Sequence, residues 1–503
     1  MNNRVKKVLP LLIGAWCAGA SANFEPVAGD DSITIYSSMH PGAVSPDLYR
    51  PVAGRQFGGQ VPGYAIVRHD RSYDIEKGLH ALRITDVAAL IDPTTVTFSS
   101  LDQPATNVVE QSFQFDLVSQ AKLFQKYLGE RITLEQPRGD HVNLIEGVLL
   151  GAGDGLTIQL DDGTVQAVRH YSNVRFSQLP GGLITRPTLE WLLSSPVRGP
   201  QETRISYETR GMTWWADYNI IYDESENCSM DLSAWVSIIN QSGATYNNAK
   251  LKLIAGDVNR AEAKRPRRDV VYKMAAMEED SAGFVEQSFF EYHMYTLGRE
   301  TTLPDNSTRQ IQLMPAAKGI GCEKELVFAP TMGMPYLGYQ QYEQDYGRYG
   351  NGDVNVYLRF SNDTAHNLGI PLPAGRIRVN QADPVDGSLE FIGEDVLDHT
   401  PKNEEVLIEM GNSFDVVGER KQTDFRVDRA SRNLWETFEI TLRNHKEEEV
   451  SVAVLENLYR GANWKIEQPS QRHTKENSNR IRFDVKVPPD GERIVRYTAH
   501  YTW

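Results

Sequence analysis

GMTWWADYNIIYDESENCSMDLSAWVSIINQSGATYNNAKLKLIAGDVN spans residues 211–259 and holds three runs in which apolar residues alternate with polar or mixed ones. Alternation with a period of two predicts β-strands with one buried face each. The sequence Asn240-Gln241-Ser242-Gly243, between the second and third runs, is typical of a turn. The stretch therefore predicts an antiparallel β-sandwich. The alternating residues are Met212, Trp214, Ala216, Tyr218 and Ile220, then Leu232, Ala234, Val236 and Ile238, then Ala249, Leu251 and Leu253.

The pattern of strand, asparagine-containing turn and strand recurs twice further along the chain. Residues 354–360 precede Asn362, and residues 438–442 precede a turn at Asn444 that leads into residues 450–454. We interpret the recurrence as two β-sandwich domains, 199–330 and 353–503. The segment 331–352 between them is rich in Gly, Tyr and Gln and is predicted to be a mobile loop.

The first part of the chain predicts smaller units. Several short alternating runs indicate an N-terminal β domain at 23–118, and residues 119–129 have helical spacing with a final glycine. Residues 130–180 contain short strands joined by Asp-Gly turns, which is typical of a small SH3-like barrel. The expected fold class is all-β: tandem antiparallel β-sandwiches with a small SH3-like barrel and one short linking helix.

The N-terminus is typical of a signal peptide. A charged start (Arg4, Lys6 and Lys7) precedes a short apolar run at 8–18 and a small-residue site at 20–22. We expect cleavage after residue 22, so that residues 1–22 are removed. No later stretch is apolar enough for a transmembrane helix, so the mature chain is expected to lack a membrane anchor. The expected location is the periplasm, with secretion or association with the outer membrane as alternatives.

The cysteine count follows from this export. The chain has three cysteines, and Cys17 would leave with the signal peptide, so that the mature chain keeps Cys228 and Cys322. An oxidising compartment favours a disulfide between them. A disulfide and two free thiols both remain open, because the sequence does not supply the distance between the two residues.

The charge composition excludes nucleic acid as a partner. The formal net charge is −15, whereas proteins that follow a nucleic-acid backbone need clustered Lys and Arg. The one basic run, at 264–268, is expected to be a solvated loop. We find no nucleophile elbow, no metal-binding histidine spacing and no phosphate-binding loop, so no cofactor is expected and the chain is expected not to be an enzyme.

Two segments are candidate sites. Glu394, Asp395, Asp398 and His399 place three acids and a histidine within six residues, a set that could bind Ca²⁺ or serve as an acid–base pair. A solvated strand end is the alternative. The loop at 331–352 is the candidate contact surface, since exposed aromatic rings can stack on sugars or anchor a partner. A disordered connection is its alternative. Its tyrosines are Tyr336, Tyr339, Tyr342, Tyr346 and Tyr349.

Several further segments resemble an exported bacterial family that is defined by a C-terminal domain of unknown function, number 4139, and that has mucoidy-inhibitor-A-like relatives. Besides residues 211–224 and 240–260, the resemblance rests on TLPDNSTRQIQL (302–313), GIPLPAGRIRV (369–379), FIGEDVLDHTP (391–401), FDVVGERKQTDF (414–425) and ITLRNHKEEEVSV (440–452). EGVLLGAGDGLTIQLDDG (146–163) and LITRPTLEWLL (183–193) match the same family. The resemblance implies an exported all-β protein and supplies no catalytic residues.

The functional expectation is a non-catalytic binding or structural module of the cell envelope, with an envelope protein or polysaccharide as its partner. One alternative is a carboxylate-based hydrolase of envelope polysaccharide that uses Glu394, Asp395, Asp398 and His399. A second alternative is an outer-membrane-associated β protein. Its motivation is the aromatic alternation at the C-terminus (Val495, Tyr497, Ala499, Tyr501 and Trp503). A last sandwich strand is the favoured explanation of that alternation, because the strands vary in length and charged residues fill many intervening positions.

Overall fold

The computed structural model describes residues 27–37, 61–115, 118–138, 141–178, 183–224, 228–256, 258, 283–334, 339–347 and 352–503. The expected signal peptide, with Cys17, and the basic run at 264–268 lie outside these ranges, as do Tyr336 and Tyr349. Strands dominate the described chain, which confirms the all-β prediction. The one α-helix described, α1 (Gln120–Lys126), starts after Ser119, whose side chain accepts a hydrogen bond from the amide of Lys122. Among the described helices, none is long and apolar enough to cross a membrane.

Two large sheets enclose the main core. The eight-stranded sheet has the order β16–β17–β15–β1–β2–β12–β4, and β18 pairs with β15. Its strands are β1 (Val27–Tyr36), β2 (Tyr64–Ile75), β4 (Ile91–Ser100), β12 (Gly199–Arg210), β15 (Tyr246–Ala255), β16 (Phe284–Phe289), β17 (Tyr292–Leu297) and β18 (Thr301–Leu303). A three-stranded sheet, β3 (Gly78–Ile84), β11 (Thr188–Ser195) and β5 (Asn107–Gln114), contributes to the same core.

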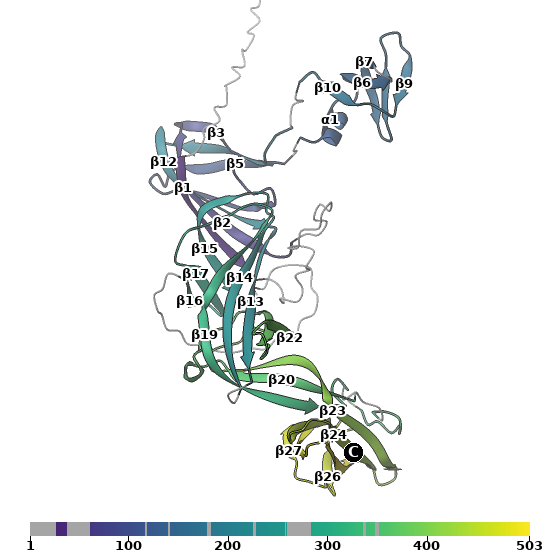
Figure 1. Ribbon diagram of the computed structural model, residues 1–503. Helices are drawn as coiled ribbons and strands as arrows, with labels where there is room; N and C mark the ends of the chain where they lie inside the picture. Colours follow the sequence, from purple (N-terminus) through teal and green to yellow (C-terminus); the bar gives the residue numbers. More distant parts are fainter. Residues whose placement is uncertain are drawn as a thin grey trace, which may run out of the picture.

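The thirteen-stranded sheet runs along the rest of the molecule (Figure 1) in the order β22–β21–β13–β14–β19–β20–β23–β24–β29–β26, with β25, β27 and β28 beside it. Its first members are β13 (Met212–Asp223), β14 (Ser229–Asn240), β19 (Ser307–Phe328), β20 (Asp353–Ser361), β21 (Gly375–Ala382) and β22 (Leu389–Leu397). The others are β23 (Glu405–Asp428), β24 (Asn433–Asn444), β25 (Val450–Asn457), β26 (Trp464–Glu467), β27 (Thr474–Asn477), β28 (Arg480–Val487) and β29 (Gly491–Thr502). A short 3-10 helix, η3 (Thr364–His366), follows β20.

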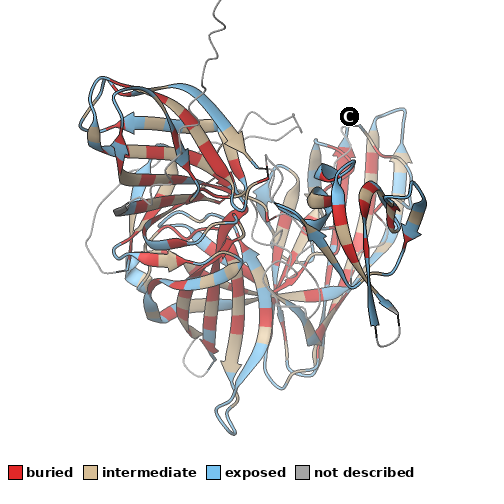
Figure 2. Ribbon diagram, turned by 90° about the horizontal axis from the view of Figure 1, so that it is seen from above, coloured by how far each residue is buried: buried red, intermediate tan, exposed pale blue. Residues whose placement is uncertain are grey.

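The quoted stretch forms the strands that its alternation predicts. Strands β13, β14 and β15 bury the apolar side chains of the pattern, and Figure 2 shows buried and exposed residues alternating along strands of the molecule. The indole Nε1 of Trp214, on β13, donates a hydrogen bond to the carbonyl of Ile254, on β15, at 3.2 Å. This bond joins the two large sheets, so the stretch holds both layers of the first sandwich.

Strands from distant parts of the chain share that first sandwich. Strand β1 pairs in parallel with β15, with Ile33 opposite Leu251, and β12 lies between β2 and β4. The ranges 23–118 and 199–330, expected as separate domains, therefore contribute to one sheet and one hydrophobic core. Parallel pairing needs a long connection, which local sequence patterns do not reveal.

Two very long strands join successive sandwiches. Strand β19 pairs with β14 through its first part and with β20 through its last part, from Cys322 onward. Strand β23 pairs first with β20 and then with β24. Each long strand therefore passes from one hydrophobic unit into the next, so the units are linked by continuous hydrogen-bonded strands and not by flexible linkers.

The three asparagine turns share one bonding pattern. The buried side-chain amide of Asn240 donates to the carbonyls of Ala244, Leu303 and Pro304. That of Asn444 donates to the carbonyls of Glu448, Val487 and Pro488, and that of Asn362 to the carbonyls of Ile370 and Pro401. Each asparagine thus ties its own turn to a later proline-containing turn. Buried carbonyls need such partners, which explains why the asparagine recurs at the end of each strand.

The C-terminal sandwich has its own core. Its inner face comes mainly from β24, β25, β28 and β29, and Phe438, Val452, Phe483 and Tyr497 are among its buried residues. Strand β29, which carries the C-terminal aromatic alternation, lies between β24 and β26.

The unit expected to be an SH3-like barrel forms five strands around a small core with α1. They are β6 (Arg131–Arg138), β7 (His141–Ala152), β8 (Leu156–Gln159), β9 (Val165–Val168) and β10 (Asn173–Phe176), in the order β10–β6–β7–β8–β9. The edge strands β10 and β9 do not pair with each other, so these strands form an open sheet and not a closed barrel. Gly151, Gly153 and Gly155 lie in the hairpin between β7 and β8 and its flanks.

A disulfide joins Cys228 to Cys322, with the two Cα atoms 5.1 Å apart. The amide of Cys322 also donates a hydrogen bond to the carbonyl of Cys228 at 3.1 Å. The bridge ties the segment before β14 to β19 at the point where β19 leaves β14 and begins to pair with β20. Of the two states left open by the sequence, the structure therefore contains the disulfide.

Candidate functional site

The acidic candidate site is not a convergent one. Glu394 and Asp395 are neighbours on β22, so their side chains leave opposite faces of the strand. Arg378 donates to the Glu394 carboxylate at 2.7 Å. The Asp395 carboxylate instead accepts hydrogen bonds from the amides of Val396 and Glu409, at 2.7 and 2.8 Å. The Asp395 carboxylate thus links β22 to β23 and stabilises their contact.

The two other members of that candidate site lie beyond β22. The carbonyl of Asp398 accepts a hydrogen bond from the Thr400 hydroxyl, and Nδ1 of His399 accepts one from the amide of Ala374 at 3.0 Å. Among the residues that the structure describes, no group of three or more His, Cys, Asp or Glu side chains is placed to hold a metal ion. The structure does not bring Glu394, Asp395, Asp398 and His399 together into one site.

The tyrosine-rich segment packs on the C-terminal sandwich where the structure describes it. The ring of Tyr342 contacts that of Trp503 edge-on, with centroids 5.1 Å apart, and Tyr346 contacts Tyr459 in the same way at 5.6 Å. Tyr339 is 64% exposed. The expected mobile connection is therefore a packed segment over residues 339–347, in which one described tyrosine projects into solvent and two are half-buried.

A buried arginine explains this packing. The guanidinium of Arg460, which has no exposed surface, donates to the carbonyls of Gln341, Glu343, Gln344 and Tyr346. A chain that supplies four carbonyls to one guanidinium is held in a fixed curve around it. Residues 339–347 therefore owe their position to Arg460.

The charge of Arg460 is balanced inside the core. Its Nε donates to the carboxylate of Glu436, which is also fully buried on the inner face of β24. Burial raises the pKa of the Glu436 carboxyl above its usual value, although the charge of Arg460 and its hydrogen bond act in the opposite direction. A second buried pair lies beside it, because Arg420 donates to Glu456 at 3.0 Å and to the carbonyl of Gly347 at 2.8 Å.

A pocket of about 480 Å³ opens where β23 and β24 meet their connecting turn. Two arginines line it, and each guanidinium lies over an aromatic ring. That of Arg426 is 3.8 Å from the ring centroid of Trp435, and that of Arg429 is 5.1 Å from the ring centroid of Tyr342. We call Tyr342, Arg426, Arg429, Trp435 and Trp503 the arginine corner.

Strand register creates one side of the arginine corner. Arg426 lies opposite Trp435 in the β23–β24 pair, and Trp435 lies opposite His500 in the β24–β29 pair. The rings of Trp435 and His500 stack with centroids 4.5 Å apart. Cross-strand neighbours share a face of the sheet, so the three side chains form a row across its outer surface.

The C-terminus and the tyrosine segment form the other side. The amide of Trp503 donates to the carbonyl of Arg432, in the β23–β24 turn, at 3.3 Å. Because Tyr342 packs on Trp503, the segment 339–347, the turn and the C-terminus meet at one place. Only Tyr342 of this group was a sequence candidate. The arginines and tryptophans carry no motif, and only the register of β23, β24 and β29 brings them together.

The electrostatics of the arginine corner favour an anion. Neither Arg426 nor Arg429 has a hydrogen bond or an ion pair with another side chain in the described ranges. Asp428 lies between them, but its carboxylate accepts hydrogen bonds from the amides of Ala430 and Ser431. The bonds from Ser431 and Ala430, together with the nearby charge of Arg426, lower the pKa of Asp428, so one carboxylate faces two guanidiniums and the corner keeps an excess of positive charge. The two exposed guanidiniums therefore keep their planar N–H donors for a ligand.

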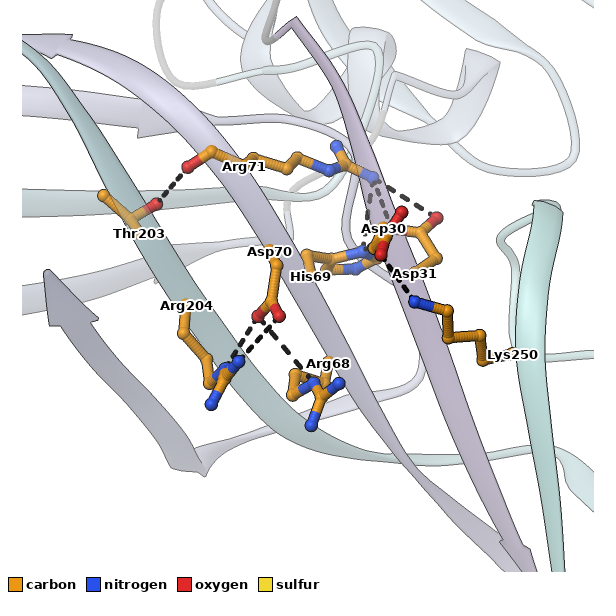
Figure 3. Close-up of polar contacts among 9 residues, drawn as sticks. All are labelled: Asp30, Asp31, Arg68, His69, Asp70, Arg71, Thr203, Arg204 and Lys250. Carbon is orange, nitrogen blue, oxygen red and sulfur yellow. Dashed lines mark hydrogen bonds and ion pairs between the residues drawn. The ribbon is translucent and has the colours of Figure 1, made fainter. Parts of the chain in front are cut away.

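A second polar cluster lies in the first sandwich (Figure 3). His69 Nδ1 is 2.6 Å from Asp31 Oδ1. His69 Nε2 is 3.1 Å from the hydroxyl of Tyr207, which Figure 3 does not draw. Arg71 contacts the Asp31 carboxylate at 3.1 Å, and Arg204 contacts that of Asp70 at 2.7 Å. No sequence motif marks this cluster, because its members come from three different strands, β1, β2 and β12.

Burial decides what this cluster can do. His69 and Tyr207 are almost fully buried. Burial lowers the pKa of His69 more than Asp31 raises it, so the imidazole is neutral at pH 7, with Nδ1–H donating to Asp31 and Nε2 accepting from Tyr207. Burial alone would raise the pKa of Asp31, but His69 and Arg71 outweigh it and the pKa is lowered. An aspartate that orients a histidine resembles part of a catalytic triad, but here the histidine faces a buried phenol. The cluster is a core hydrogen-bond network.

A family comparison covers the region that contains the arginine corner. The model of a domain of unknown function, DUF4139, matches residues 203–503. The chain belongs to the DUF4139 family. The DUF4139 region starts within β12 and includes the acidic residues of β22, the buried arginine pairs and the arginine corner. No curated protein and no solved structure matches the chain.

Proposed function

We propose that this DUF4139 protein is an exported envelope protein that binds an envelope component through its C-terminal sandwich and performs no chemistry on it. The observation that carries the proposal is the arginine corner. It combines two exposed cations, three aromatic rings and a pocket at one end of a rigid sandwich.

Two observations support export. The first 22 residues have the pattern of a signal peptide. The disulfide between Cys228 and Cys322 is of the kind that persists in oxidising compartments and is rare in the cytosol. A periplasmic location is therefore the proposed one.

The arrangement of carboxylates favours binding over hydrolysis. Glycoside hydrolysis needs two carboxyl groups that face each other across the bond to be cleaved. Glu394 and Asp395 leave opposite faces of β22, and each is engaged by a neighbour. The arrangement of Glu394 and Asp395 therefore supports binding more than hydrolysis, and the arginine corner offers hydrogen-bond donors to a ligand.

The test uses the mature chain, residues 23–503, immobilised and exposed to separate glycan and protein fractions of the envelope. The proposal predicts retention of one fraction by the wild type and weaker retention by Trp435→Ser. Val165→Ser, an exposed change on the five-stranded unit, is the matched control and should retain as much as the wild type. Retention of neither fraction by the wild type, or equal loss in both variants, would refute the proposal.

A further inference from the structure

We infer that the arginine corner binds the carboxylate or phosphate group of an envelope glycan. This inference rests on the proposed function and specifies its ligand. The shared chemistry is an oxyanion carried on a sugar.

The arginines are prepared for an oxyanion by their aromatic partners. A guanidinium that stacks on a ring uses its flat face and leaves its N–H edge available. Arg426 is held in this way at 3.8 Å from the Trp435 ring, and Arg429 lies over Tyr342. The strongest hydrogen bonds that the N–H edge of a guanidinium forms are bidentate pairs with a carboxylate or a phosphate. Since the aromatic faces already hold the cations, the anion is the recognised group.

Two observations favour a glycan over a peptide. Strands β24 and β29, which carry Trp435 and His500, are each paired on both sides at the arginine corner, whereas β23 pairs there with β24 alone. A peptide that extended the sheet would add beside β23, away from the face that carries Trp435 and His500. The outer face beside the corner is instead polar. The hydroxyls of Thr437 and Thr498 lie 2.9 Å apart there, one position along each strand face from Trp435 and His500. Hydroxyl groups on an open face suit the hydroxyls of a sugar.

The pocket and the overall charge limit what can bind. The pocket of about 480 Å³ is open to solvent and lined by five residues, so it can hold the charged group of a glycan while the rest of the glycan stays in solvent. The chain has a net charge of −15, so an anion meets attraction only where unpaired cations gather. Binding should therefore be local, specific and weakened by salt.

The experiment titrates the mature protein calorimetrically with four probes. Trigalacturonate carries carboxylates, glucose 6-phosphate carries a phosphate, maltotriose is neutral and tri-glutamate is an acidic peptide. The variants are Arg426→Gln/Arg429→Gln and the control Arg493→Gln, an exposed arginine elsewhere on β29. Loss of two charge-assisted hydrogen bonds should weaken binding about tenfold or more in the double variant. The control should match the wild type.

The four probes distinguish a carboxylate ligand from a phosphate ligand, and the variants distinguish failure of this inference from failure of the proposed function. Binding of trigalacturonate alone identifies a uronate source, and binding of glucose 6-phosphate alone identifies a phosphate source. Equal binding of maltotriose, tighter binding of tri-glutamate, or an unchanged double variant would overturn the inference. If the double variant still retains the envelope fraction, the inference fails while the proposed function stands. If the wild type retains neither envelope fraction, the proposed function itself fails.

Discussion

Replacing Arg460 by methionine tests how the tyrosine segment is held. The change removes a fully buried guanidinium that bonds to Glu436 and to four carbonyls of residues 341–346. Methionine keeps the aliphatic volume but leaves Glu436 buried without its counter-ion. Breaking a buried ion pair in this way costs about 3–5 kcal/mol. We expect the free energy of unfolding to fall by that amount at pH 7, measured by denaturant titration.

A second variant isolates the charge. In Arg460→Met/Glu436→Gln the unpaired carboxylate is gone, so we expect part of the loss to be recovered, with a coupling of about 1–3 kcal/mol. Protonation of Glu436 should have a similar effect, because burial already raises the pKa of this carboxyl. The destabilisation of Arg460→Met should therefore be smaller at pH 5 than at pH 8. Amide hydrogen exchange at 339–347 should increase in both variants, since neither retains the donor for the four carbonyls.

A loss below about 1 kcal/mol in Arg460→Met, together with unchanged hydrogen exchange at 339–347, would show that Arg460 does not hold the segment. Equal stability of the single and the double variant would show that the unpaired Glu436 charge is not the cause of the loss.

Three further outcomes follow from the structure. Cys228→Ser/Cys322→Ser should lose about 4 kcal/mol of unfolding free energy in denaturant titration, because the disulfide closes a loop with a sequence separation of 94 residues. An unchanged denaturant concentration at the midpoint of unfolding would contradict this expectation. Asn444→Ala should lose about 2–4 kcal/mol by the same assay, because it leaves three carbonyls without their donor. Asn433→Ala, at the half-buried start of β24, should lose less, because its amide nitrogen bonds only to the neighbouring Ser431. The pKa of His69 is lowered in the folded chain, so below about pH 6.5 the unfolded chain binds a proton that the folded chain does not bind. The free energy of unfolding should therefore fall from pH 7 to pH 5, and more steeply in the wild type than in His69→Gln. Equal slopes in the two proteins would contradict a neutral buried imidazole.

The sequence predicted the strands and part of the arrangement of the sandwiches. Period-two alternation is local, so β13, β14 and β15 could be read from it directly. The asparagine turns were recognisable as a repeat, although their bonds to Leu303 and Val487 were not, since those carbonyls lie far along the chain. The parallel pairing of β1 with β15 is non-local in the same way, so strands from 23–118 and 199–330 could not be assigned to one sheet.

The candidate sites show the same limit. Glu394 and Asp395 are adjacent in sequence but leave opposite faces of a strand, so proximity along the chain does not make a site. Trp435 and His500 are distant in sequence but adjacent across paired strands, and Arg426 faces Trp435 across the β23–β24 hairpin. The sequence contained one indication of the buried ion pair between Arg460 and Glu436. Glu436 occupies a core position in the alternation Leu434, Glu436, Phe438. A charge at such a position needs a buried partner, which the sequence alone does not identify.

Binding at the arginine corner is tested most directly by photo-crosslinking in the living cell. A benzophenone amino acid replaces Ala430, an exposed residue next to Arg429 in the β23–β24 turn, and in a second strain it replaces Val165 on the five-stranded unit. The full chain is expressed with its N-terminus intact, irradiated, and its adducts are separated by cell fraction. An exported protein that binds its partner at the arginine corner should form an adduct with an envelope component at position 430 and none at position 165. Adducts with cytoplasmic proteins, or the same adducts at both positions, would contradict an exported protein that binds its partner at the arginine corner.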